Sequence, residues 1–285
     1  MSIKPFIKVP LVLAENAIFS LLPSARKIVE RIIFNPYSFG FNHLEYARKQ
    51  FESFLLKISP TRVRNKVILE LGPGGSIGFG LLTLKNGAKK YYAIENGDHT
   101  KVDSKIFKAY KKLLDNNTRL ISEFFTKDFH FNREKICFIE DDQTSQYNLP
   151  DNSVDIIYSC AVLEHVHNLD FCFSEMTRVL KNGGIMNHQV DLRDHIFSQR
   201  SIWFLKIGDS VFNTLFSKTG EYINRKRFSY YLQLIKANNL EVVSIEKNIL
   251  FEEKIDKQLL KQYSEDDLRT LSINITLKKH KHEKK

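Results

Sequence analysis

The chain has 285 residues, of which 42% are hydrophobic and 27% charged, as is typical of a folded globular protein. A net charge of +10, part of it in the C-terminal "KKHKHEKK", permits an anionic partner without requiring one. The three cysteines, Cys137, Cys160 and Cys172, have no CxxC spacing, which excludes a zinc site built from them and predicts reduced thiols in a cytoplasmic protein.

The first 60 residues predict a helical extension. The segment "VPLVLAENAIFSLL" (9–22) is apolar, but it contains Glu15 and is shorter than the ~20 residues of a transmembrane helix. We expect it to pack on the body of the protein, with a weak contact to a membrane surface as the alternative. Residues 24–58 carry aromatic and aliphatic side chains at helical spacing, which predicts a packed segment and not a free linker.

From residue 66 onward, short apolar runs alternate with helical patterns. Helices are expected at 101–114 and 169–180, the second ended by Gly183 and Gly184. The alternation implies parallel pairing with helices on both faces, hence a doubly wound α/β domain over residues 61–277 and a basic tail at 278–285. The expected strands are 66–71, 90–95, 135–140, 154–159, 184–192, 241–246 and 271–277.

A glycine-rich stretch, "VILELGPGGSIGFG" (67–80), follows the first expected strand. It lacks the third glycine of a dinucleotide fingerprint, because Ile77 stands there, and it lacks the Gly-Lys-Ser/Thr of a phosphate loop. Glu70 precedes the glycines, where a carboxylate attracts an ammonium group and repels a pyrophosphate. Glu95 ends the second strand and can accept both hydroxyls of a ribose. A ligand with an amino-acid end and a ribose end fits, which points to S-adenosylmethionine.

Two separated motifs carry a resemblance to a known family. "ELGPGGSIG" (70–78) resembles the first motif of class I S-adenosylmethionine-dependent methyltransferases. The stretch "LPDNSVDIIYSCAVLEHVHNLDFCFSEMTRVLKNGG" (149–184) is similar to the subfamily often called type 11. The resemblance spans roughly residues 65–190 and implies a seven-stranded Rossmann-like methyltransferase sheet with the helical extension in front of it.

The resemblance also implies a set of cofactor-binding residues. Asp141 and Asp142 are alternatives for the adenine contact, and either could instead be a solvated loop acid, because their spacing to the next motif is longer than expected. The set comprises Glu70, Gly72, Gly74 and Gly75 for the methionine part, Glu95 for the ribose, Asp141 or Asp142 for the adenine, and Ser159, Cys160 and Ala161 near the sulfonium.

Methyl transfer to a hydroxyl group needs a base or a metal ion beyond the carboxyl ends of strands four and five. His165 follows strand four, and Asp191 and His195 follow strand five in "HQVDLRDH" (188–195), so these three are the catalytic candidates. The alternatives are a structural histidine at 165 and acids at 191 and 194 that cap the next helix. Because Arg193 would oppose a divalent ion, we expect no metal.

The predicted activity is O-methylation of a sugar, a glycan or another small hydroxylated acceptor. "DLRDH" and "NRKRFSYYLQLI" (224–235) resemble bacterial methyltransferases that modify surface glycans. Residues 24–58 are expected to cover the acceptor pocket or to pack on the sheet. One alternative is a non-catalytic module that recruits a partner through the N-terminal extension. A nucleic-acid methyltransferase is disfavoured, because "SCAV" follows strand four in place of an Asn-Pro-Pro-aromatic sequence.

Overall fold

The computed structural model describes residues 10, 13–14, 16–18, 21, 42–58, 62–95, 102, 104–140, 146–196, 202–218, 222–250 and 255–280. Both candidate adenine ligands, Asp141 and Asp142, lie outside these residues, as do most of the first 41 residues and the last five.

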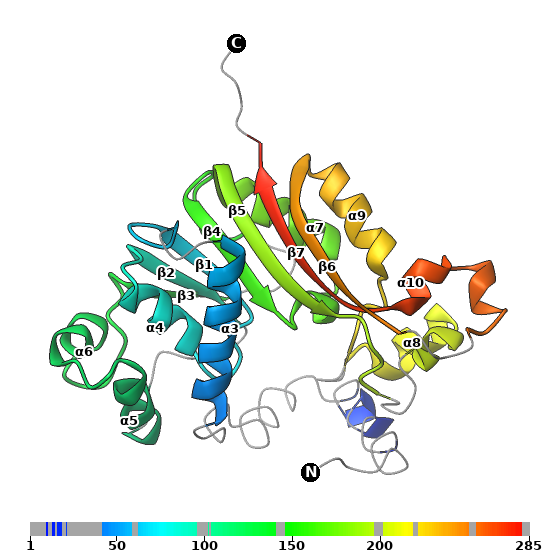
Figure 1. Ribbon diagram of the computed structural model, residues 1–285. Helices are drawn as coiled ribbons and strands as arrows, with labels where there is room; N and C mark the ends of the chain where they lie inside the picture. Colours follow the sequence, from blue (N-terminus) through cyan, green and yellow to red (C-terminus); the bar gives the residue numbers. More distant parts are fainter. Residues whose placement is uncertain are drawn as a thin grey trace.

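A seven-stranded sheet organises the described residues, with the strand order β3-β2-β1-β4-β5-β7-β6 (Figure 1). The five strands from β3 to β5 pair in parallel, and β7 runs antiparallel between β5 and β6. The seven predicted strands and the Rossmann-like α/β class are thus confirmed. The strands are β1 Val67–Leu71, β2 Lys90–Ile94, β3 Ile136–Ile139, β4 Val154–Cys160, β5 Leu180–Asp191, β6 Leu240–Ile249 and β7 Thr270–Lys279.

The parallel pairing predicted from the alternation holds for β1 to β5, whereas the last strand pairs antiparallel with both of its neighbours. Parallel neighbours need a crossover connection, usually a helix, whereas antiparallel neighbours do not. Between β6 and β7 the described chain contains the single turn η4 (Leu259–Lys261) and the five-residue helix α10 (Glu265–Arg269). Strand β7 therefore runs back along β6 as its antiparallel partner.

Helices cover both faces of the sheet, as the alternating pattern predicted. On one face lie α3 (Asn42–Ile58), α4 (Gly78–Lys85) and α5 (Ser104–Leu113), and on the other α7 (Leu169–Val179) and α9 (Phe228–Ala237). The remaining described helices are α6 Thr118–Phe124, α8 Asp209–Phe216 and the short turns η2 Leu163–His165 and η3 Trp203–Lys206.

The predicted end of the helix at 169–180 needs a correction. The helix ends at Val179, before the glycines, because Leu180 is already extended and pairs with Val154 of β4. Gly183 and Gly184 lie inside β5, at a register shift between this pair and the next. Gly183 has a φ of +77°, which suits an irregular strand position and ends no helix here.

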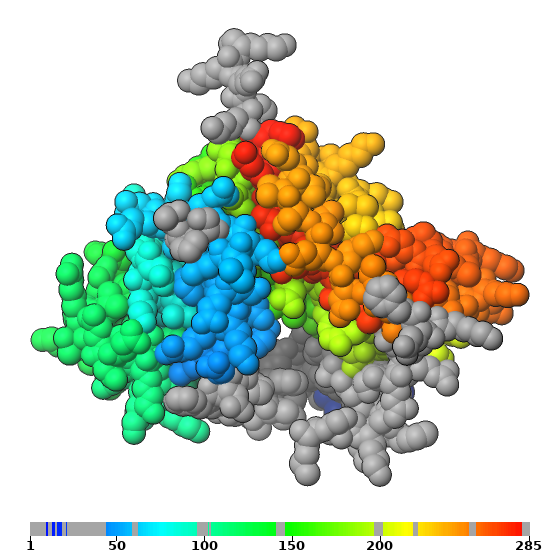
Figure 2. Space-filling model, viewed as in Figure 1, coloured from blue at the N-terminus to red at the C-terminus, as the bar shows by residue number. Residues whose placement is uncertain are grey.

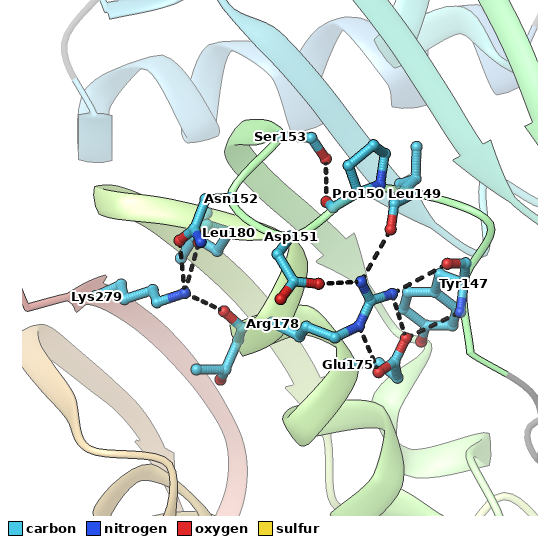
Figure 3. A network of polar contacts seen from close by, with 11 residues as sticks. Tyr147, Leu149, Pro150, Asp151, Asn152, Ser153, Glu175, Arg178, Leu180 and Lys279 are labelled. Atoms are coloured by element: carbon cyan, nitrogen blue, oxygen red, sulfur yellow. Dashed lines mark hydrogen bonds and ion pairs between the residues drawn. The ribbon is translucent and has the colours of Figure 1, made fainter.

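Arg178, in the last turn of α7, holds the segment that leads into β4 (Figure 3). Its guanidinium donates to Glu175 at 2.8 Å, to Asp151 at 2.7 Å and to the carbonyls of Leu149 at 2.9 Å and Tyr147 at 3.0 Å. Arg178 and its partners in the second motif thus act structurally, by fixing the entry of β4.

Helix α3 is packed on the domain. The ring of Phe54 lies 5.1 Å from that of Phe79 on α4 and 5.2 Å from that of Tyr158 on β4, all centroid to centroid. Figure 2 shows the surface of α3 meeting that of β6, where Lys57 forms an ion pair with Glu246. The predicted packing of this part of the extension is therefore observed, while the domain boundary near residue 60 stays a prediction.

The described part of the first N-terminal segment also contacts the body of the protein. Asn16 is buried, donates to the carbonyl of Thr214 on α8 at 2.9 Å and accepts from the backbone N–H of Lys218 at 3.1 Å. Within the described ranges, no helix combines the length and the apolar character needed to cross a membrane. All three cysteines are described, and none forms a disulfide.

Truncation of Phe54 tests whether α3 is an integral part of the fold. Phe54→Ala should lower the free energy of unfolding by about 3–5 kcal/mol, because a buried aromatic ring is lost from the core. Leu56→Ala is the matched control in the same helix, since Leu56 is 86% exposed and its loss should cost less than about 0.5 kcal/mol. Equal denaturation midpoints for the two variants in urea would contradict the packing of α3.

Candidate functional site

The loop after β1 packs directly on the chain that follows β4. Gly72 has a φ of +60°, and a Cβ built on it would lie 2.6 Å from a methyl carbon of Val162. Its N–H donates to the carbonyl of Ile94 at the end of β2 at 2.9 Å. Glycine is therefore required at position 72 for two reasons, left-handed backbone and close approach. The loop lies at the carboxyl ends of the strands, where open α/β sheets bind ligands.

Gly74 leaves room above the loop. Its φ is +62°, and nothing lies within 4 Å of the place that a Cβ would take. Its N–H donates to Oε2 of Glu95 at 2.9 Å, which brings that carboxylate to the same loop. Gly75 follows in the same half-buried turn. Open backbone beside a carboxylate is the cradle that the methionine and ribose parts of S-adenosylmethionine would need, so the residues fit that cofactor.

Glu70 lies beneath this loop and is only 7% exposed. Burial raises its pKa to about 8, while a hydrogen bond from the hydroxyl of Tyr91 at 2.5 Å opposes the rise and the charge of Glu95 adds to it. An ammonium group arriving above the loop would favour the ionised form. The predicted contact between Glu70 and the cofactor stays a prediction.

One residue that supports Glu70, Tyr91, was not identified from the sequence. Tyr91 is fully buried, and its ring occupies the space above Gly80, where a Cβ would lie 2.4 Å from the ring. A glycine inside helix α4 was the available signal, because glycine in a helix interior usually reflects close packing.

The chain at the end of β4 has its side chains engaged with protein. The Oγ of Ser159 lies 2.8 Å from Nδ1 of His188, and burial lowers the pKa of that histidine to about 3, so it is neutral. The Sγ of Cys160 lies 3.2 Å from the hydroxyl of Tyr46 on α3. Ala161 has a φ of +54°. If these three residues lie near the sulfonium, their backbone atoms would therefore make the contact, as the resemblance implied.

The three catalytic candidates lie together beyond β4 and β5. The rings of His165 and His195 are 5.2 Å apart, and Nε2 of His195 lies 3.5 Å from Oδ2 of Asp191. Nδ1 of His165 lies 2.6 Å from the carbonyl oxygen of Tyr222. Because a carbonyl only accepts, the hydrogen is assigned to Nδ1, which leaves the lone pair on Nε2. When the ring of His165 is neutral, it is therefore in the tautomer that a general base needs.

Glu164 belongs to the same cluster, although the sequence did not single it out as catalytic. Its side chain is buried, and burial raises its pKa to about 7. Oε1 accepts from the backbone N–H of Asp191 at 3.1 Å, whereas Oε2 is buried without a hydrogen-bond partner. Only the fold brings this carboxylate to strand five, because the two residues are 27 positions apart.

Asp191 is ionised and clamped by Arg193. Although burial opposes it, hydrogen bonds from Arg193 and His195 hold the pKa of Asp191 well below its usual range. Arg193 donates to both carboxylate oxygens, at 2.9 and 2.6 Å. Asp194 instead accepts hydrogen bonds from the backbone N–H of Ile196 and from that of Phe204, the second at 3.1 Å. It therefore holds the chain that follows it. Among the described residues, no group of three or more His, Cys, Asp or Glu is arranged to hold a metal ion.

In the "NRKRF" sequence Arg225, Arg227 and Phe228 are buried, and the polar side chains hold neighbouring backbone. Asn224 donates to the carbonyls of Leu163 and Val166 at 2.7 and 3.0 Å, which fixes the η2 turn. Arg227 is 2% exposed and donates to the backbone carbonyls of Asp267 within α10 and of Thr270 just after it. Arg225 donates to carbonyls around η3. These side chains hold the loops that surround the catalytic candidates.

Residues 69–187 match the family model described as a methyltransferase domain. No curated protein matches the chain. Solved structures with a similar fold include an S-adenosylmethionine-dependent methyltransferase from Mesorhizobium loti, with 14% identity, 76% of this chain and 93% of that chain covered, and a TM-score of 0.45. Another is phosphoethanolamine N-methyltransferase 2 from Haemonchus contortus in complex with S-adenosyl-L-methionine. Its identity is 16% and its TM-score 0.47, and the match covers 82% of this chain and 53% of that chain. Similarity at this level carries no information on the acceptor of this chain.

Replacement of Glu95 tests the ribose contact. Glu95→Ala should weaken binding of S-adenosylmethionine by about 1.5–3 kcal/mol, the range for hydrogen bonds to a charged group. Isothermal calorimetry measures this, with Glu241→Ala on the exposed part of β6 as the control. Unchanged affinity in Glu95→Ala, or thermal stabilisation of the wild type by NAD alone, would contradict the assignment.

Glu70 should make the cofactor-free protein less stable at alkaline pH. Its pKa is about 8 in the folded protein against an ordinary 4.5, so its contribution to stability is complete below the ordinary value and is lost as pH rises through 8. Glu70→Gln keeps an acceptor for Tyr91 and cannot ionise. Its stability relative to wild type should therefore rise by roughly 1–4 kcal/mol between about pH 5 and pH 9. Urea unfolding checks this, and a pH-independent difference would refute it.

Proposed function

We propose that this protein, a class I S-adenosylmethionine-dependent methyltransferase, methylates a hydroxyl group of a sugar, a glycan or another small hydroxylated acceptor. The matched domain gives the enzyme class and the cofactor. The acceptor class and the residue roles that follow are inferences from the chemistry of the site. Bound S-adenosylmethionine supplies an electrophilic methyl group on a positively charged sulfur.

The observation that carries the proposal is the contact between Nδ1 of His165 and the carbonyl oxygen of Tyr222. A hydroxyl oxygen is a weak nucleophile until it loses its proton, so its methylation needs a base near the reacting oxygen. The carbonyl of Tyr222, 2.6 Å from Nδ1, orients the ring and leaves the lone pair on Nε2. His165 follows β4 by five residues and thus lies at the end of the strand next to the cofactor loop. We assign it the role of general base.

Asp191 and His195 would support this base. When His165 takes up a proton, positive charge arises 5.2 Å from the ring of His195, which itself lies 3.5 Å from the ionised Asp191. A carboxylate behind His195 favours positive charge on that side of the site. Because Arg193 already occupies both oxygens of Asp191, we keep the interpretation that the reaction uses no divalent ion.

A flat aromatic surface beside His165 supports a sugar-like acceptor. The rings of His167 and Tyr222 stack at 3.9 Å with an interplanar angle of 9°, and Tyr222 is the residue that orients His165. Aromatic rings offer a broad apolar face for the carbon–hydrogen side of a small ligand, while nearby polar groups fix its orientation. That the protein acts on a small molecule inside the cytoplasm stays a prediction. The weak membrane contact of the N-terminal segment also stays a prediction.

The acceptor class can be tested with S-adenosylmethionine that carries a radiolabelled methyl group. Incubation with fractionated cell glycans, lipids and RNA should label the glycan fraction or small hydroxylated compounds derived from it. The label should persist in chelator, because the proposed base is a histidine. Labelling confined to RNA or to lipid amines, or activity that returns only with added magnesium, would contradict the proposal.

His165→Ala should lower the rate in that assay by about 10²–10⁴-fold, as expected for loss of a general base. Binding of S-adenosylmethionine by calorimetry should stay unchanged, because His165 lies on the acceptor side. His130→Ala, an exposed histidine before β3, is the matched control and should keep full activity. A His165→Ala enzyme with the wild-type rate would exclude this residue as the base.

A further inference from the structure

One face of β5 is polar on the side of the sheet that α3 covers. Ile185 belongs to the hydrophobic cluster that includes α3, whereas Met186 and Val190 belong to the cluster on the other face. Because successive side chains of a strand point to opposite faces, Asn187 and Gln189 lie on the same face as Ile185. Asn187 is only 1% exposed and Gln189 is half-buried, so neither is an ordinary surface residue.

Strand β7 continues this polar face. Its buried isoleucines belong to the opposite cluster, which leaves Asn274 and Thr276 on the same side of the sheet as α3. In the register of the sheet, Asn274 pairs with Gln189 and Thr276 pairs with Asn187, so the four side chains form one patch. We call Asn187, Gln189, Asn274 and Thr276 the amide face.

Hydrogen bonds leave two amide groups of this patch as open donors. Nδ2 of Asn187 donates to Oδ1 of Asn274 at 2.9 Å and to Oγ1 of Thr276 at 3.0 Å. Sγ of Cys160 on β4 donates to Oε1 of Gln189 at 3.5 Å. No described residue accepts a hydrogen bond from Nε2 of Gln189 or from Nδ2 of Asn274. These two neighbouring groups can therefore donate to the oxygen atoms of a ligand.

Helix α3 and strand β6 border the amide face. The hydroxyl of Tyr46 on α3 lies 3.2 Å from Sγ of Cys160 on β4. Near the other end of the helix, Lys57 forms an ion pair with Glu246 on β6. Because β5 and β7 lie between β4 and β6, the amide face lies between the helix and β6 (Figure 1).

The amide face adjoins both halves of the candidate site. Gln189 is the register partner of Cys160 at the end of β4, and β4 pairs with β1, which leads into the cofactor loop. Asp191 follows Gln189 by two positions, so it lies on the same face of β5. Its carboxylate is 3.5 Å from Nε2 of His195. A ligand on the amide face would therefore lie next to the end of β4 and to the catalytic candidates.

The charges that border the amide face favour an uncharged ligand. Each cation of the described residues there lies beside a carboxylate and gives no unpaired positive charge to an anion. Neutral amide donors instead suit the oxygen atoms of hydroxyl groups. The cations and their carboxylates are Lys57 with Glu246, Arg193 with Asp191, and Lys278 with its register partner Glu241.

We propose that the amide face is the acceptor subsite, where Gln189 and Asn274 donate hydrogen bonds to hydroxyl oxygens of an uncharged, sugar-like part of the acceptor. This inference rests on the proposed function for the class of the acceptor and adds the place where it binds. Both residues hold the acceptor and take no part in the transfer of the methyl group. Their loss should therefore weaken binding of the acceptor and leave the chemical step unchanged.

The test removes one donor at a time from the full chain. Gln189→Met keeps the length of the side chain, and Asn274→Ala leaves Thr276 as a partner for Asn187. With methyl-labelled S-adenosylmethionine and the glycan fraction, each variant should need about 3–10-fold more glycan for half its maximal rate, as expected for one neutral hydrogen bond. The rate at saturation and the affinity for S-adenosylmethionine should stay unchanged. Gln233→Ala, exposed on α9 across the sheet, is the matched control.

Two outcomes of this assay separate the inference from the proposed function. If the glycan fraction is labelled and both variants need no more of it than the wild type, the inference is wrong and the proposed function stands. If the label appears only outside the glycan fraction, the proposed function is wrong. Binding of glycan to the amide face is then decided by a second measurement.

That measurement follows the reaction of Cys160 with N-ethylmaleimide in the wild-type protein, so it needs neither methyl transfer nor a variant that folds. Sγ of Cys160 contacts Gln189, so glycan bound to the amide face should slow the modification of this thiol. Mass spectrometry of the peptides measures the rate, with S-adenosylhomocysteine in every sample and the half-buried Cys137 on β3 as the internal control. A glycan fraction that leaves the modification of Cys160 unchanged would overturn the inference.

Discussion

The close packing of the β1 loop on the chain after β4 is the constraint on which the site depends. A side chain at position 72 would overlap Val162, because the backbone of Gly72 in the first loop contacts the side chain of Val162 in the second. This contact lies between β1 and β4, where the strand order reverses, and it joins the glycine loop to the chain that continues into the turn with Glu164 and His165. A bulkier residue at position 72 would separate the two halves of the site.

Around this contact the protein buries several ionisable groups, and burial shifts their pKa values in favour of the neutral forms. Glu70 has a pKa raised to about 8, Glu164 one raised to about 7, and His188 one lowered to about 3, in each case mainly by burial. Neutral groups are the stable choice in a poorly solvated site that has no ligand. A cationic ligand or a transferred proton changes this balance, because it makes the ionised carboxylates favourable. The site is thus electrostatically prepared for positive charge.

A third hydrophobic cluster, separate from the two beside the sheet, lies largely in the chain that follows β5. Phe204, Phe212 and Phe216 form its centre, between η3 and α8. Buried arginines connect it to the sheet: Arg225 bonds to the carbonyl of Phe204, and Arg227 bonds to loops next to β5 and β7. Arginine suits this task, because its five donors can satisfy several carbonyls that would otherwise be buried without partners. The residues around His195 and Tyr222 are positioned by these bonds.

The sequence by itself determined the strands, their number and the cofactor loop, because these features depend on short-range patterns of apolar residues and glycines. Tertiary structure decided the antiparallel place of β7 and the end of α7 at Val179, since both depend on which strand pairs with which. Tertiary structure also decided which distant side chains contact the predicted site residues. Tyr91 reaches Glu70 across 21 positions, Glu164 reaches Asp191 across 27, and Tyr46 reaches Cys160 across 114. No local pattern encodes such pairs or the burial that shifts their pKa values, because both arise only when distant segments exclude water together.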